Sequence, residues 1–216
     1  MRIQLAARIL MAIVSTSAAG GLRAEAAEPG SPPAIVESLN AVMLDVMKNA
    51  ETLGYAGRRD KLMPALDAAY DVSFMAEKVV GRHWDKLSED ERKRWVALFR
   101  EFLAANYAGR FDRHSGQSFE TLGQEPSAFD TVLVKTRIVD PGGENVNLDY
   151  RLHETPAGWR IVDLYLKGTV SELALRRSDY TAVLERDGIE ALATYLREKI
   201  SALEAGKGDP VVPARE

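Results

Sequence analysis

The hydrophobic period of this chain changes at Gly116, and this change constrains the fold more than any other feature. Before Gly116, apolar residues recur every three to four positions, which indicates amphipathic helices. The expected helices cover residues 35–50, 60–70, 72–80 and 88–112. Two of them carry clear start signals: Asp71 can cap one, and Ser88 with Glu91 forms a capping box for the longest.

In the second half of the chain, apolar and polar residues alternate, which is typical of strands with one buried face. The expected strands cover residues 118–122, 131–139, 146–153 and 159–167. Short turns such as Asp140–Gly143 join them, so the sheet should be antiparallel. Gly168 then leads into two more helical patterns, 170–186 and 189–203. The predicted fold class is α+β: an antiparallel sheet of about four strands covered by N-terminal and C-terminal helices.

The two ends of the chain differ from its middle. Residues 1–26 begin with arginines, continue into a short apolar run and end in Ala24-Glu25-Ala26, the pattern of a cleaved secretory signal peptide. The alternative is an uncleaved anchor, but the apolar run is shorter than the roughly 20 residues that a membrane span needs. We expect a linker at 27–34, one domain at 35–204 and a disordered tail at 205–216.

The composition narrows the cellular setting and the class of partner. The chain contains no cysteine, so an exported form has neither disulfides nor thiol chemistry, and its core must supply its stability. The periplasm fits such a protein. A formal net charge of −4 argues against nucleic acid as a partner, because nucleic-acid binding usually needs a basic face. We expect a monomer.

The sequence contains no motif of a known catalytic or metal site. The three histidines, His83, His114 and His153, do not form the local pairs that zinc sites usually use. Nucleophile elbows and phosphate-binding loops are also missing from the sequence. We therefore predict no catalytic residues, no metal and no cofactor. Arg176-Arg177 could contact a headgroup or a partner, or could be one solvated and one ion-paired arginine.

The aliphatic face of the predicted sheet permits two interpretations. Its side chains could form a closed core or could line a cavity, and the alternation alone does not decide between them. Trp84 and Trp159, each next to a turn, could rim an opening or mark the edge of the core.

Several short motifs, in order, resemble the MlaC or toluene-tolerance family of periplasmic lipid-binding proteins. They are V-S-F-M-A-E-K-V-V-G-R-H-W at 72–84, the helix with Phe99, Phe102 and Tyr107, the strand V-L-V-K-T-R-I, Y-R-L at 150–152 and G-W-R-I-V-D-L at 158–164. The resemblance covers about residues 35–203. After Gly168 the segment S-E-L-A-L-R-R-S-D-Y is most similar to the hopanoid-associated HpnM branch.

The resemblance implies a soluble lipid carrier with an apolar cavity between the sheet and its helices. The cargo would be a phospholipid or a hopanoid, exchanged with an inner-membrane lipid transporter and with an outer-membrane lipoprotein complex. The residues expected to line the pocket are Phe74, Met75, Phe99, Phe102, Val132, Val134, Ile138, Val146, Leu148, Tyr150, Val162, Leu164, Leu166, Leu173 and Tyr180. Two rival classes remain: a periplasmic adaptor that binds protein, with a filled core and an exposed apolar patch, and an enzyme with ionisable groups in its pocket.

Overall fold

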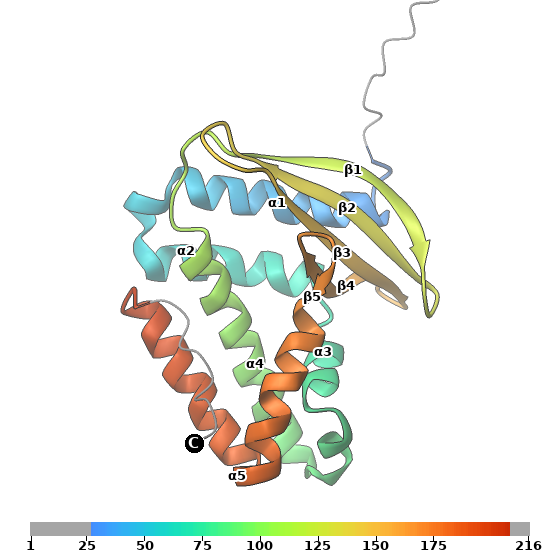
Figure 1. The fold of residues 1–216 in the computed structure, drawn as a ribbon, viewed down its shortest axis with the longest axis vertical. Helices are drawn as coiled ribbons and strands as arrows, with labels where there is room; N and C mark the ends of the chain where they lie inside the picture. The colour runs from blue at the N-terminus through green and yellow to red at the C-terminus, as the bar shows by residue number, and fades with distance from the viewer. Residues whose placement is uncertain (1–26, 208–216) are drawn as a thin grey trace, which may run out of the picture.

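The structure is a computed structural model, and it describes residues 27–207. The predicted signal peptide and most of the predicted tail lie outside these residues. The described chain folds into helices and one sheet, in the order expected (Figure 1). The helices are α1 (Pro32–Lys48), α2 (Ala50–Ala69), α3 (Val72–Val80), the short 3-10 helix Gly81–Lys86, α4 (Glu89–Arg110) and α5 (Glu172–Glu204).

The sheet is antiparallel, and its strands follow one another in chain order. They are β1 (Ser118–Ser127), β2 (Thr131–Val139), β3 (Val146–Thr155), β4 (Gly158–Leu166) and the two-residue β5 (Val170–Ser171). Figure 1 shows the sheet curving over α1, while α4 and α5 extend away from it to form a helical lower half. The predicted α+β class is confirmed, and the fifth strand, β5, is an addition to the expected sheet.

The helix starts follow the capping signals in the sequence. The Asp71 carboxylate accepts a hydrogen bond from the Phe74 backbone N–H at 2.9 Å, which caps α3. At the start of α4, the Ser88 hydroxyl accepts from the Glu91 backbone N–H while the Glu91 carboxylate accepts from the Ser88 N–H, forming the predicted box. Gly188 interrupts α5 with a φ of 80°, where the turn between two helices was expected.

Some boundaries differ from the prediction. Helix α1 begins at Pro32 because proline is well suited to a first helical position, so part of the predicted linker is helical. Gly54, which lies between the expected helices 35–50 and 60–70, interrupts α2, but the helix resumes directly afterwards rather than at Asp60, which places Pro64 inside the helix. Strand β1 extends to Ser127 because it pairs with the whole of β2.

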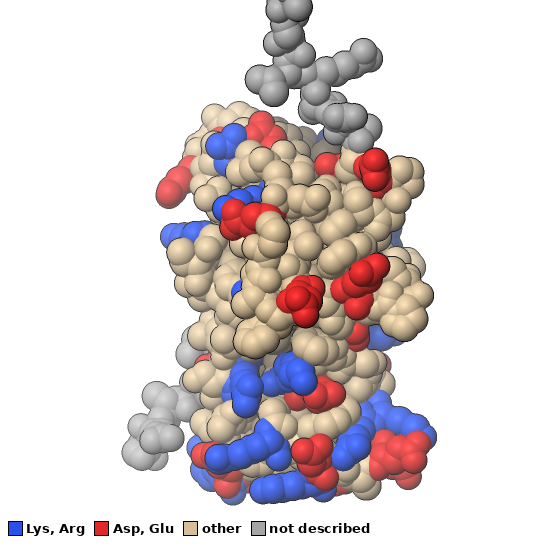
Figure 2. Space-filling model, turned by 90° about the vertical axis from the view of Figure 1, so that its right-hand side faces the viewer, with Lys and Arg blue, Asp and Glu red and all other residues tan. Residues whose placement is uncertain are grey.

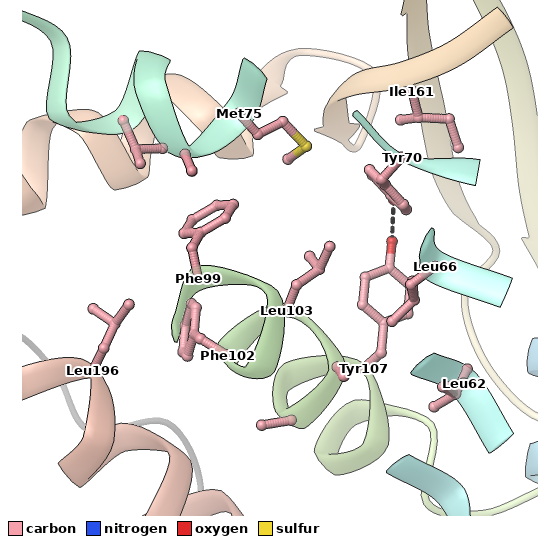
Figure 3. Close-up of a cluster of buried hydrophobic side chains, with 14 of the residues drawn as sticks. Leu62, Leu66, Tyr70, Met75, Phe99, Phe102, Leu103, Tyr107, Ile161 and Leu196 are labelled. Atoms are coloured by element: carbon pink, nitrogen blue, oxygen red, sulfur yellow. Dashed lines mark hydrogen bonds between the residues drawn. The ribbon is translucent and has the colours of Figure 1, made fainter. Parts of the chain in front are cut away.

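The core lies between the curved sheet and the helices, and continues into the helical lower half. Trp95 of α4 is 2% exposed, and its indole N–H donates to the Ala76 carbonyl of α3 at 2.9 Å. Figure 3 shows Phe99 and Phe102 on the side of α4 that faces Leu196 of α5. Within residues 27–207, none of the helices combines the length and the apolar character needed to cross a membrane.

Candidate functional site

An apolar cavity of about 190 Å³ lies where the sheet meets α3, α4 and the start of α5. Seven of the residues predicted to line a pocket border this cavity. They are Met75, Ile138, Val146, Leu148, Tyr150, Leu164 and Leu166. Alternation placed these β2, β3 and β4 side chains on one face of the sheet, and antiparallel pairing brings them together: Leu148 pairs with Leu166, and Tyr150 pairs with Leu164.

Five of the predicted residues pack in the closed core or against it instead. They are Phe99, Phe102, Val132, Val134 and Tyr180. The rings of Phe99 and Tyr180 pack on Trp95, with centroids 6.1 and 6.0 Å from the indole, so the α4 stripe is divided between two sets of neighbours. Figure 3 shows this division: Leu103 and Tyr107 project toward Tyr70, whereas Phe99 and Phe102 project the other way.

The remaining three predicted residues, Phe74, Val162 and Leu173, line a separate groove on the opposite face of β3 and β4. For Val162 the cause is a β-bulge. Arg151 pairs with Asp163 and the next residue, Leu152, pairs with Ile161, so β4 contains one residue more than β3 at this point. Ile161 therefore enters the core, and the expectation that Val162 shares the face of Leu164 and Leu166 is wrong.

Eight cavity residues were not in the predicted set, and most of them are polar or aromatic. They are Tyr70, Leu103, Asn106, Tyr107, Arg110, Phe111, Glu172 and Arg176. Four come from the last turns of α4, where the run A-A-N-Y-A is buried although it contains an asparagine. A polar residue inside a buried helical stripe was the sequence signal that could have indicated this part of the site.

Two tyrosine hydroxyls meet at one side of the cavity. The hydroxyl groups of Tyr70 and Tyr107 are hydrogen-bonded to each other, as Figure 3 shows. Burial raises the pKa of Tyr70 well above its ordinary value and raises the pKa of Tyr107 to about 12. Both groups are therefore neutral at physiological pH and act as hydrogen-bonding groups rather than as bases.

A buried ion pair forms the polar edge of the cavity at the start of α5. The Arg176 guanidinium lies 3.2 Å from the Glu172 carboxylate one helical turn earlier, and the two side chains are only 15% and 11% exposed. Arg176 also lies 4.9 Å from the centre of the Phe102 ring. In this structure Arg176 is ion-paired and Arg177 is exposed.

Asn106 contributes the third polar feature. Its side chain is 3% exposed and borders the cavity, and its Nδ2 has no hydrogen-bond partner among the described residues. A buried donor without an acceptor is unfavourable, and native proteins seldom leave one unless a ligand or water satisfies it. The cavity is thus apolar with a few convergent polar groups, which is the general character of a small-molecule site.

The geometry offers little for metal or acid–base chemistry. Within residues 27–207, no three His, Asp or Glu side chains gather closely enough to hold a metal ion. His114 contacts the Gln117 carbonyl, and His153 pairs with Asp71 at 3.0 Å. Trp84 and Trp159 are partly buried against the core and border neither the cavity nor the groove, which favours the core-edge interpretation.

The family of this chain follows from the match of its sequence. The family described as MlaC protein matches residues 37–198, which is most of the described chain. The protein belongs to the MlaC family. One relative is the intermembrane phospholipid transport system binding protein MlaC of Haemophilus influenzae, which is 22% identical to this chain over 147 residues. The alignment covers 66% of this chain and 66% of that protein, slightly under two thirds of each.

A solved structure shares the fold of this chain. The phospholipid-binding protein from Ralstonia solanacearum, in complex with a phospholipid, matches with a TM-score of 0.66. The two sequences are 23% identical, and the match covers 79% of this chain and 97% of that one. At this identity the likeness shows a shared fold.

Proposed function

We propose that this protein is a periplasmic carrier that binds a phospholipid and moves it between membranes as one component of a lipid-transport system. The observation that carries the proposal is the apolar cavity between the sheet and α3, α4 and α5. Membership of the MlaC family supports it, as do a relative named for intermembrane phospholipid transport and a neighbour solved with a phospholipid.

The cavity suits a lipid in its chemistry more than in its present size. Its sheet wall is almost wholly aliphatic, and burial stabilises an acyl chain by roughly 0.8 kcal/mol per methylene. A carrier thereby removes most of the cost of moving two acyl chains through water. About 190 Å³ is less than the roughly 300–1,000 Å³ of typical ligand sites, so cargo entry must widen the space between sheet and helices.

The polar groups of the cavity favour a phospholipid over a hopanoid. The Asn106 Nδ2 needs an acceptor, and the ester carbonyls of a diacyl lipid offer one beside their acyl chains. The fused hydrocarbon rings of a hopanoid carry no acceptor at that depth. The HpnM-like segment after Gly168 points the other way, and the test below separates the two cargoes.

The transport partners follow from the proposed cargo. A protein without an energy source must receive and deliver its lipid by exchange with membrane-bound components, for which an inner-membrane transporter and an outer-membrane lipoprotein complex are the proposed classes. The signal-peptide pattern supports a periplasmic location. A protein-binding adaptor remains the alternative, and it would carry no lipid.

The decisive experiment is organic extraction of the mature protein purified from its native host, followed by lipid mass spectrometry. A stoichiometric phospholipid supports the proposal, and a stoichiometric hopanoid would assign the protein to the HpnM branch. An empty extract from folded protein would favour the adaptor.

A single variant tests whether the cavity holds the cargo. Leu148 is 5% exposed and lies on the cavity wall, so Leu148→Trp should fill the space and abolish lipid retention. The matched control is Leu175→Trp, at a residue that is 49% exposed and borders neither the cavity nor the groove. Because over-packing costs typically 1–3 kcal/mol of stability, circular dichroism must show that both variants fold. Full lipid retention by folded Leu148→Trp would contradict the proposed site.

A further inference from the structure

The groove on the opposite face of β3 and β4 is larger than the cavity and has a different chemistry. We call it the outer groove; its volume is about 590 Å³, within the usual range of ligand sites. Strands β3 and β4 form its floor, and α3, the first turns of α5 and the β1–β2 turn form its walls. Helix α3 separates the outer groove from the cavity: Phe74 lines the outer groove, and its neighbour Met75 lines the cavity.

The outer groove is basic although the protein is acidic. Three cationic side chains line it: Lys78 of α3, Arg151 of β3 and Arg177 of α5. Lys78 pairs with Glu77 at 2.6 Å, whereas Arg151 and Arg177 have no ion pair among residues 27–207. Figure 2 shows a face of the molecule on which most of the Lys and Arg lie in the lower half, with Asp and Glu among them, while the upper half carries mainly scattered Asp and Glu.

Asp163 is the one carboxylate that the described chain places in the lining of the outer groove, and its oxygens already accept hydrogen bonds. They accept hydrogen bonds from the Leu173 backbone N–H at 3.0 Å and from the Ser171 hydroxyl at 2.6 Å, at the start of α5. The Leu164 N–H donates to the same carboxylate at 2.8 Å. Asp163 therefore holds α5 against β4 and leaves the arginines without a carboxylate to bind.

Arg151 is held in place but not fully satisfied. Its guanidinium lies 5.0 Å from the centre of the Tyr165 ring, and its Nε is buried without a hydrogen-bond partner among the described residues. A planar guanidinium fixed on an aromatic ring is prepared to bind an oxyanion through two parallel hydrogen bonds. Arg177 is fixed as well: it packs so closely on Gly81 that a Cβ there would lie 2.8 Å from the guanidinium.

The rim of the outer groove is apolar and exposed. Phe129, in the turn between β1 and β2, is 90% exposed and has a left-handed φ of 62°. Bulky residues rarely adopt that conformation, and such strain clusters at binding sites. Phe74, Val162 and Leu173 add further apolar surface to the lining that the groove shares with the arginines.

We propose that the outer groove is a second ligand site, which binds the phosphate group of an anionic amphiphile. Arg151 and Arg177 receive the phosphate oxygens, and the apolar part of the ligand lies against Phe129 and Leu173. A phosphate fits better than a carboxylate because it presents enough oxygens and charge to engage two separate guanidinium groups at once. This site does not depend on the proposed function of the cavity.

The test is calorimetric titration of delipidated Leu148→Trp, whose cavity is blocked, with monomeric dihexanoyl-phosphatidylglycerol. We expect one equivalent to bind, with affinity that falls as salt rises. Arg151→Gln should weaken binding at least about tenfold, and Arg151→Lys should weaken it less. The control is Arg137→Gln, on the same sheet face but paired with Glu120 at 2.6 Å outside the groove; it should bind normally.

Further arms separate the sources of the phosphate. Inorganic phosphate or decanoate binding as tightly as the lipid would overturn the assignment to a phosphate-bearing amphiphile. No binding, or binding that Arg151→Gln leaves unchanged, would overturn the site itself. If the protein cosedimented with phosphatidylglycerol vesicles but did not bind the monomeric lipid, the proposed ligand site would be overturned in favour of docking to a membrane surface. The Arg151 comparison is repeated in wild-type protein, so that the result does not rest on the folding of Leu148→Trp.

Discussion

Replacing Asn106 by leucine should make the empty protein more stable and a weaker lipid binder. The Asn106 side chain is 3% exposed and its Nδ2 has no partner within residues 27–207, so folding removes this donor from water without compensation. An unsatisfied buried donor costs about 1–3 kcal/mol, and leucine has a similar shape without the polar atoms. The adjoining cavity of about 190 Å³ gives room for the two leucine methyl groups, which are slightly larger than the amide oxygen and nitrogen that they replace.

The expected gain is about 1–2 kcal/mol in the free energy of unfolding of delipidated protein. For a chain of this size, each kcal/mol raises the Tm by roughly 2–4 °C. Lipid binding should change in the opposite direction, because the ester carbonyl loses its donor, and the affinity should fall by up to about tenfold. Urea unfolding followed by circular dichroism measures the first quantity, and competition with a fluorescent phospholipid measures the second.

A matched asparagine provides the control. Asn40 of α1 is 5% exposed, and its Oδ1 accepts a hydrogen bond from the Tyr150 hydroxyl at 3.4 Å. Asn40→Leu should therefore destabilise the protein, since it leaves the Tyr150 hydroxyl buried without its acceptor. If Asn106→Leu were also destabilising, or if it bound phospholipid as tightly as the wild type, the inference that Asn106 waits for a ligand acceptor would be refuted.

Two further predictions concern stability. Burial raises the pKa of Tyr107 in the folded protein to about 12, so the unfolded chain loses this proton first as the pH rises above about 10. The free energy of unfolding should therefore fall between pH 10 and 12, by up to about 1.4 kcal/mol per pH unit. In urea unfolding, the free energy of Tyr107→Phe should fall less steeply with pH over the same range. The second prediction concerns Gly188, whose φ of 80° and ψ of −175° lie in a region that other residues avoid. Gly188→Ala should therefore lower the free energy of unfolding, measured in urea, by about 1–3 kcal/mol. The cause would be backbone strain alone, since nothing lies within 4 Å of the added Cβ. An unchanged unfolding midpoint for Gly188→Ala, or an unchanged alkaline slope for Tyr107→Phe, would contradict the respective argument.

Local signals in the sequence predicted most of the fold correctly. The Asp71 cap, the Ser88–Glu91 box and the break at Gly188 depend only on residues a few positions apart, so the sequence contains all the information that places them. The strand Thr131–Val139 was predicted with its observed bounds for the same reason. Alternation also placed Leu148, Tyr150, Leu164 and Leu166 on the cavity face.

Tertiary structure decided which apolar residues line the cavity and which form solid core. A helical stripe such as that of α4 is wide enough to face two sets of neighbours, so Tyr107 reaches the cavity while Phe99 packs on Trp95. The bulge opposite Arg151 and Leu152 depends on how β3 and β4 pair, and alternation along β4 alone could not place Val162. The contact of Arg151 with Tyr165 and that of Arg176 with Phe102 likewise join different elements. The sequence by itself determined the helices and strands, their order and the apolar face of the sheet, because these depend on neighbours along the chain. Only the folded structure decided the cavity, its polar groups and the outer groove, because these depend on contacts between segments that are distant in the chain.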